Sequence, residues 1–352
     1  MKNVYFFLSN RCSYERARVL LYELEEEKEI QLTLLIGGGL VDEEFSDLRS
    51  DIHSRFNAIE LDHGRADGTL QGMATVGTRI GRRVNDMFSR LRPDLLVLWA
   101  DRHELLPVAM VAAYLQIPIC HIQGGEDSGN IDQRVRHAVS MMSDLHMVSH
   151  DEAYKKLVSF GLNNVHQTGC PSLDVIDRLG IKRAKVLNDT VICLYHPHTN
   201  EIDNVRQECE SVYDNLSKFC HEKKLRLLWL APNNDPGFIH INDALSNEIE
   251  IVQNMPSILF LEELARCQMI VGNTSSCIRE ASFLAVPSVL IGDRQVGRVK
   301  AKNAISSGIY GLKQALNAAY DMVPEQSFLF GDGNSSRRIV SIMKGFLDGK
   351  EK

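Results

Sequence analysis

The chain has 352 residues, of which 44% are hydrophobic and 24% charged, and it carries a net charge of -7. A chain of this length usually forms more than one hydrophobic core, so two globular domains are expected. The acidic balance argues against a nucleic-acid-binding protein, and no apolar run is long enough to span a membrane. The eight cysteines form no C-x-x-C pair, which is typical of reduced thiols in a cytoplasmic protein without structural zinc.

Apolar runs with continuous rather than alternating hydrophobicity recur along the chain, and they predict parallel strands covered by helices on both faces. In the first half we expect strands at 4–8, 32–36, 94–99, 117–122 and 145–149, and helices at 14–26, 70–92 and 104–115. In the second half we expect strands at 191–195, 225–230, 269–272 and 288–292. The predicted fold class is α/β, with two doubly wound, Rossmann-like parallel-sheet domains facing a central cleft.

Turn residues place the domain boundary, because Gly169 and Pro171 interrupt the pattern there. We expect a first domain over residues 1–168 and a second over 169–337. The C-terminal helix, at about 338–352, is expected to join the first domain.

Polar and ionisable residues follow nearly every expected strand. In the first domain they are the arginines of "SNRCSYER", the motif "ADRHE" and the stretch "QGGEDSGNIDQRVRHA". In the second domain they are "HPHTNE", "GNTSSCIREA" and "GDRQVGR". Because ligands of doubly wound sheets sit beyond the carboxyl ends of the strands, one ligand site between the two domains is predicted.

The segment 272–276, "GNTSS", has two interpretations. It is either a plain helix N-cap or a cradle of amides and hydroxyls for a diphosphate at a positive dipole end. In the second case Arg11, Arg294 and Arg298 are candidates to complete the anion site. The Glu280 carboxylate then either accepts the two hydroxyls of a ribose or faces solvent.

Asp132 and Arg136 are four residues apart on an expected helix, so they form either an ordinary ion pair or part of a site. Asp101 and Arg102 arrive on the neighbouring strand, which favours the site. Carboxylates crowded together tend to hold a proton near neutral pH, as general acid and base roles require.

His196 and His198 lack a third ligand nearby in the sequence, so we expect no metal, and a strand-end histidine that bonds a phosphate explains the pattern at least as well.

In order and spacing, from about residue 3 to 305, these motifs resemble the UDP-N-acetylglucosamine 2-epimerases. The match is closest to the hydrolysing branch, which makes N-acetylmannosamine for sialic acid synthesis. The resemblance implies a GT-B-like fold with the nucleotide held mainly by the second domain. It also implies elimination of the nucleoside diphosphate to a 2-acetamidoglucal, followed by hydration, without a metal or redox cofactor.

Taken with the resemblance, these motifs give two sets of candidate residues. The candidate catalytic residues are Asp101, Gln123, Glu126, Asp132 and Arg136. The candidate substrate-binding residues are Arg11, Arg16, Arg102, His196, Asn273, Thr274, Ser275, Glu280 and Arg294.

Three departures from the family pattern bear on substrate identity more than on reaction type. Gln123 stands where many relatives carry an acid, Ser13 replaces another acid, and Ala100 replaces the glycine of "GDR". The leading hypothesis is hydrolysis of UDP-N-acetylglucosamine with inversion at C2. The alternatives are a UDP- or GDP-linked 2,4-diacetamido sugar, a catalytically silent nucleotide-sugar binder and, by analogy of fold alone, a glycosyltransferase.

Members of this fold are commonly oligomers, so a homodimer or homotetramer is expected. The amphipathic segment 70–92 is either its interface or a core-facing helix, and the second interpretation is the stronger.

Overall fold

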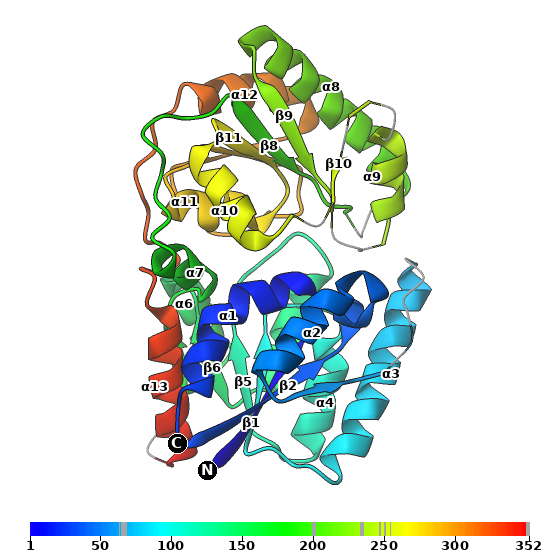
Figure 1. Ribbon diagram of the computed structural model, residues 1–352, viewed down its shortest axis with the longest axis vertical. Coiled ribbons are helices and arrows are strands. Elements are labelled where there is room, and N and C mark those ends of the chain that lie inside the picture. The colour runs from blue at the N-terminus through cyan, green and yellow to red at the C-terminus, as the bar shows by residue number, and fades with distance from the viewer. Residues whose placement is uncertain are drawn as a thin grey trace. The chain divides into compact units, whose positions relative to one another are not determined.

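The computed structural model describes residues 1–62, 64, 69–198, 202–232, 236–245, 248–249, 251–253 and 255–349. The chain divides into two units, each with its own parallel sheet (Figure 1). The first unit comprises Met1–Glu126, Asp132–Val175 and Gly331–Lys352, and the second comprises Asp127–Ile131 and Ile176–Phe330. The main passage from the first unit to the second lies inside helix α7 (Ser172–Arg178), just after the boundary expected near residue 168.

The sheet of the first unit has seven parallel strands in the order β3-β2-β1-β4-β5-β6-β7. They are β1 (Lys2–Leu8), β2 (Ile30–Ile36), β3 (Ala58–Glu60), β4 (Leu95–Trp99), β5 (Ile119–Ile122), β6 (Leu145–Val148) and β7 (Val165–Gln167). Because the order reverses between β1 and β4, the ligand side of this doubly wound sheet is expected beyond the carboxyl ends of these two strands.

Helices cover both faces of this sheet, as Figure 1 shows. They are α1 (Arg11–Glu25), α2 (Ser46–Arg55), α3 (Leu70–Phe88), α4 (Leu105–Tyr114), α5 (Asp132–Met141), α6 (Asp151–Ser159), α7 and α13 (Ser335–Leu347), with 3-10 turns η1 (Gly38–Val41) and η2 (Glu43–Phe45). On β1, Phe6 packs in the core with α1, α2 and α13, whereas Phe7 packs in the opposite core with α3 and α4. Both faces of the strand are therefore buried, which explains its continuous hydrophobicity.

The sheet of the second unit has six parallel strands in the order β10-β9-β8-β11-β12-β13. They are β8 (Thr190–Leu194), β9 (Arg226–Leu230), β10 (Ile251–Val252), β11 (Met269–Gly272), β12 (Ser288–Ile291) and β13 (Ala304–Ser307). The helices are α8 (Val205–Lys223), α9 (Phe238–Leu245), α10 (Ser257–Arg266), α11 (Glu280–Phe283) and α12 (Leu312–Tyr320), with 3-10 turns η3 (Ile202–Asn204), η4 (Ser275–Cys277) and η5 (Ile309–Gly311). The order reverses between β8 and β11, so these two strands mark its ligand side.

The predicted α/β class with two doubly wound parallel sheets is confirmed. All eight cysteines are free, and seven of them are buried. Burial raises the pKa of the Cys120 and Cys277 thiols, so both are uncharged packing groups near neutral pH. None of the helices among the described residues is long and apolar enough to cross a lipid bilayer.

Candidate active site

The first unit makes two sharp turns at the ends of neighbouring strands. Ala100 follows β4 with a φ of 70°, and Gln123 follows β5 with a φ of 64°. Both are non-glycine residues in the left-handed region, which costs about 1–3 kcal/mol when the surroundings impose it. Glycine avoids this cost, so the glycine of the family pattern "GDR" would fit the turn at position 100 without strain. The two turns bring Asp101 and Gln123 to the same edge of the sheet.

Arg136 connects this edge to helix α5. It lies one turn after Asp132, the first residue of the helix, and only 1% of it is exposed. Its Nη1 donates a hydrogen bond of 2.7 Å to the backbone carbonyl of Glu126, and its Nη2 pairs with the Asp101 carboxylate. Arg136 is therefore paired with an acid on the neighbouring strand turn. This arrangement fixes Asp101, the Glu126 backbone and α5 relative to one another.

Glu104 orients Arg102. Glu104 is 1% exposed, and its two carboxylate oxygens each lie 3.3 Å from a guanidinium nitrogen of Arg102. Burial acts to raise the pKa of the Glu104 carboxyl, but the positive charges of Arg102 and His103 outweigh it and hold that pKa below its ordinary value. The sequence alone predicts no role for Glu104, although its position in "ADRHE", two residues after Arg102, was the available signal.

Gln123 and Glu126 are both buried at the start of the loop after β5. The Gln123 side-chain amide donates to Cys170 Sγ at 2.7 Å, and that sulfur lies 3.1 Å from the Ser172 hydroxyl. The amide nitrogen of Gln123 is therefore engaged by the segment that begins α7. The predicted catalytic role of Gln123 stays a prediction.

Arg11 is the first residue of α1, directly after the end of β1, and Arg16 lies on the same helix. The helix start is a capping box, in which Asn10 Oδ1 accepts from the Ser13 amide at 2.7 Å and Ser13 Oγ accepts from the Asn10 amide at 3.1 Å. Such a box satisfies backbone donors that a helix end leaves open. Ser13, which departs from the acid of the family pattern, therefore has a structural function that holds the start of α1.

In the second unit, Asn273 joins the two strands at which the order reverses. Its Oδ1 accepts from the His196 amide at 2.7 Å, and its Nδ2 donates to the His196 carbonyl at 2.8 Å. The Asn273 carbonyl in turn accepts from Arg294 at 3.1 Å and from Gln295 at 2.8 Å. Gly272 is required just before it, because its φ is 146° and a Cβ there would collide with the Leu194 carbonyl. His196, Asn273 and Arg294 are thus held in one cluster.

The segment after Asn273 is a 3-10 turn followed by a short helix. Thr274 caps the 3-10 turn η4, accepting from the Ser276 amide at 3.3 Å, and Ser275 begins that turn. Glu280 is 5% exposed and is the first residue of α11, which has only four residues. The anion site proposed for this segment thus relies on the amides and hydroxyls of a tight turn more than on a helix dipole.

The loop Asp127–Ile131 belongs to the second unit. The Gly129 amide donates to the Arg294 carbonyl at 3.2 Å, and His198 Nε2 donates to the Gly129 carbonyl at 3.3 Å. A Cβ on Gly129 would collide with the Asp293 carbonyl, so this approach requires glycine. The glycine of "EDSGNID" thus permits close backbone packing beside Arg294.

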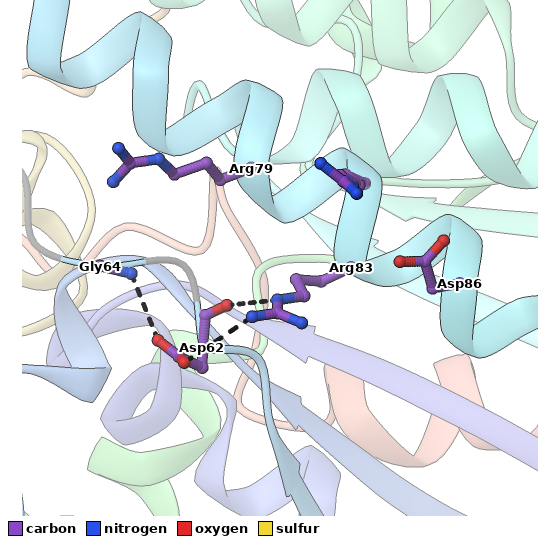
Figure 2. A pocket seen from close by; sticks show the side chains of 6 residues that line it. Asp62, Gly64, Arg79, Arg83 and Asp86 are labelled. Atoms are coloured by element: carbon purple, nitrogen blue, oxygen red, sulfur yellow. Dashed lines mark hydrogen bonds and ion pairs between the residues drawn. The ribbon is translucent and has the colours of Figure 1, made fainter.

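Two further features of the structure concern metal binding and a pocket away from the candidate residues. Within the described part of the chain, no three His, Cys, Asp or Glu side chains gather as a metal site requires. Figure 2 shows a pocket of the first unit whose described lining is Asp62, Gly64, Arg79, Arg82, Arg83 and Asp86, none of them a candidate site residue. There Arg83 Nε donates to the Asp62 carbonyl at 2.8 Å.

Known proteins resemble this chain in sequence and in fold. The family described as UDP-N-acetylglucosamine 2-epimerase matches residues 22–344. A Legionella pneumophila protein named UDP-N,N'-diacetylbacillosamine 2-epimerase (hydrolyzing) is 28% identical, with 98% of this chain and 96% of that protein covered. A Neisseria meningitidis protein named UDP-N-acetylglucosamine 2-epimerase is 27% identical, with 87% and 83% covered.

A solved structure, the UDP-GlcNAc 2-epimerase of Neisseria meningitidis bound to UDP-GlcNAc, has the same fold with a TM-score of 0.81. Its sequence is 16% identical, and the match covers 98% of this chain and 100% of that one. Because the family match spans most of its length, this chain belongs to the UDP-N-acetylglucosamine 2-epimerase family.

Proposed function

We propose that this chain is a hydrolysing nucleotide-sugar 2-epimerase, which converts UDP-N-acetylglucosamine and water into N-acetylmannosamine and UDP. The observation that carries the proposal is the buried Arg136, which pairs with Asp101 and with the Glu126 backbone at the start of the helix that carries Asp132. One carboxylate paired with a fixed cation, with two further acids in the adjoining loop and helix, supplies groups for moving protons on a sugar. Family membership and the two named relatives support the same reaction type.

The proposed reaction has two steps. First, a carboxylate removes the proton at C2 while the C1–O bond breaks, and the electron pair of the C2–H bond forms the C1=C2 double bond of a 2-acetamidoglucal. UDP leaves with the electrons of the C1–O bond. Second, water adds its oxygen to C1 and a proton returns to C2 from the opposite face, giving the free 2-epimeric sugar. Atoms balance, and no redox step is involved.

Each group of residues has a role in this proposal. Asp101, Glu126 and Asp132 exchange the protons, and Arg136 holds Asp101 in place. Gln123 is also assigned to the sugar side, where its amide, unlike the three carboxylates, cannot take up a proton. The diphosphate is assigned to His196, Asn273, Thr274, Ser275 and Arg294, with Arg11, Arg16 and Arg102 as further contacts and Glu280 on the ribose.

A second candidate substrate is a UDP- or GDP-linked 2,4-diacetamido sugar. It is favoured by the name of the Legionella pneumophila relative and by that of a Campylobacter jejuni relative, GDP/UDP-N,N'-diacetylbacillosamine 2-epimerase (hydrolyzing), which is 28% identical. The fold and the two-step chemistry stay the same. Only the groups that contact the 4-substituent of the sugar and the base differ.

A substrate panel tests the proposal. The purified protein is incubated separately with UDP-N-acetylglucosamine and with the UDP- and GDP-linked diacetamido sugars, and proton and phosphorus NMR follow the products, with Asp101→Asn as the control. We expect free N-acetylmannosamine and UDP from the first substrate, and a loss of turnover in the control. Turnover of a diacetamido sugar alone would change the proposed substrate and leave the proposed reaction type unchanged. Binding without turnover across the panel would contradict the proposed function and favour a silent binder.

A further inference from the structure

His121 lies at the centre of β5 and is completely buried. Its Nε2 is 2.9 Å from the carbonyl oxygen of Ala100, and its Nδ1 is 2.9 Å from the Ser140 hydroxyl. Since a carbonyl can only accept, Nε2 carries the ring proton. Nδ1 is then the acceptor, and the Ser140 hydroxyl donates to it. Each ring nitrogen therefore has a defined hydrogen-bond partner and a defined role, Nε2 as donor and Nδ1 as acceptor.

The two partners belong to the two elements that hold the candidate acids. Ala100 immediately precedes Asp101, and its φ of 70° is maintained by two hydrogen bonds, from its own amide to the Ile122 carbonyl at 2.9 Å and from His121 to its carbonyl. Ser140 lies on α5, four residues after Arg136 and therefore on the same face of that helix. One imidazole thus joins the turn that carries Asp101 to the helix that carries Arg136.

The surroundings keep this imidazole neutral. Burial lowers the pKa of His121 to about 4 and outweighs the hydrogen bond to Ala100, which raises it, while the neighbouring His146 and His137 lower it further. Gly124 leaves the space that the pair needs, because a Cβ there would lie 2.7 Å from Ser140 Oγ and 3.0 Å from His121 Nδ1. The donor and acceptor directions of the ring are therefore fixed across the neutral pH range.

We propose that His121 is a positioning residue of the 2-epimerase reaction, which holds the Ala100–Asp101 peptide and α5 in register so that Asp101 meets Arg136 and the sugar at the reacting geometry. The inference rests on the proposed function. His121 itself touches no substrate and moves no proton. Its effect is expected in the chemical steps, because a misplacement of about 1 Å at a reacting group can cost about 100-fold in rate.

Three variants test the inference. His121→Leu removes both hydrogen bonds at similar volume, and His121→Gln keeps a side-chain amide that can donate to Ala100. The matched control is His146→Leu. His146 pairs in register with His121 on β6, is 1% exposed, and has a pKa that burial likewise lowers to about 4. Within the described part of the chain it forms no hydrogen bond with the Asp101 turn, so it reports the general cost of losing a buried histidine.

We expect His121→Leu to lower kcat by about 10- to 100-fold with KM within about threefold of the wild type. His121→Gln should recover a large part of kcat, and His146→Leu should keep kcat near the wild-type value even where it lowers the melting temperature. Equal kcat for the two leucine variants, or a glutamine variant no better than His121→Leu, would overturn the inference.

A measurement without turnover separates this inference from the proposed function. If the wild type converts none of the nucleotide sugars, the proposed function fails, and ring-nitrogen NMR of labelled histidines still decides the geometry. The expected signal is a neutral His121 with the proton on Nε2 from pH 8 down to pH 5. A proton on Nδ1, or a ring that is charged at pH 6, would overturn the inference whatever the activity.

Discussion

Replacing Arg136 by methionine should be the most informative single change in the first unit. The guanidinium side chain is 2% exposed and that of its partner Asp101 is 19% exposed, so the pair is screened from water on the arginine side. Arg136→Met keeps the apolar volume and removes the charge. The Asp101 carboxylate then loses its cation, and the Glu126 carbonyl loses its 2.7 Å donor.

The magnitude follows from this burial. Removing one partner of a buried ion pair costs about 3–5 kcal/mol, and the partial exposure of Asp101 places this pair at about 3 kcal/mol. For a unit of this size each kcal/mol shifts the melting temperature by about 2–4 °C, so a decrease of about 6–12 °C is expected. The epimerase kcat should fall at the same time, because Asp101 is no longer held.

Differential scanning calorimetry of the full chain gives the thermal transition, with Arg134→Met as the matched control. Arg134 lies two residues away on the same helix and is exposed, so its loss removes an equal charge without the buried contacts. A double-mutant cycle with Asp101→Asn isolates the pair, and we expect a coupling free energy of about 2 kcal/mol. Melting temperatures that agree within 1 °C between the two methionine variants, or a coupling near zero, would refute the reasoning.

Three other predictions follow from buried polar groups. Asp174→Ala removes the carboxylate that accepts the first two amides of α13, at 3.0 and 2.5 Å, and should lower the free energy of unfolding in urea by about 2 kcal/mol; an unchanged midpoint would contradict this. Burial lowers the pKa of His121 and His146 from 6.5 to about 4, so the unfolded chain binds more protons between these values. Stability measured in urea should therefore be complete above pH 6.5 and fall as the pH drops to 4, by about 3 kcal/mol for each ring, and a flat profile over this range would contradict the assignment. Gln123→Glu places a carboxylate against Cys170 in a buried position, so kcat and melting temperature should both fall; a gain in kcat would show that an acid serves better there.

The central strands were predictable because burial on both faces leaves a continuous run of hydrophobic residues in the sequence. The run at 94–99 became β4, Leu95–Trp99, in which every residue is buried. The edge strands β3 and β7 were missed, because each has only three residues, none of them buried. Short, partly exposed strands carry neither continuous nor alternating hydrophobicity, so only the pairing with a neighbour defines them.

The candidate site was predictable to the level of the strand ends. Asp101 and Arg136 were expected at one edge because their segments follow or adjoin neighbouring strands. The spacing on the helix suggested Asp132 as a partner of Arg136, whereas the pairing of Arg136 with Asp101 became visible only in the tertiary fold. The role of His121 had a weak signal, a single polar residue inside the apolar run "ICHI", because a buried polar side chain needs partners.

Solvent exchange at C2 tests the central claim most directly. The wild-type protein is incubated with UDP-N-acetylglucosamine in deuterium oxide, with the UDP- and GDP-linked diacetamido sugars in parallel, and proton NMR follows the signal at C2 of the product. The account predicts a free 2-epimeric sugar with deuterium at C2 and an equal amount of nucleoside diphosphate. A product that keeps its original proton at C2, or no turnover of any substrate in the panel, would contradict it.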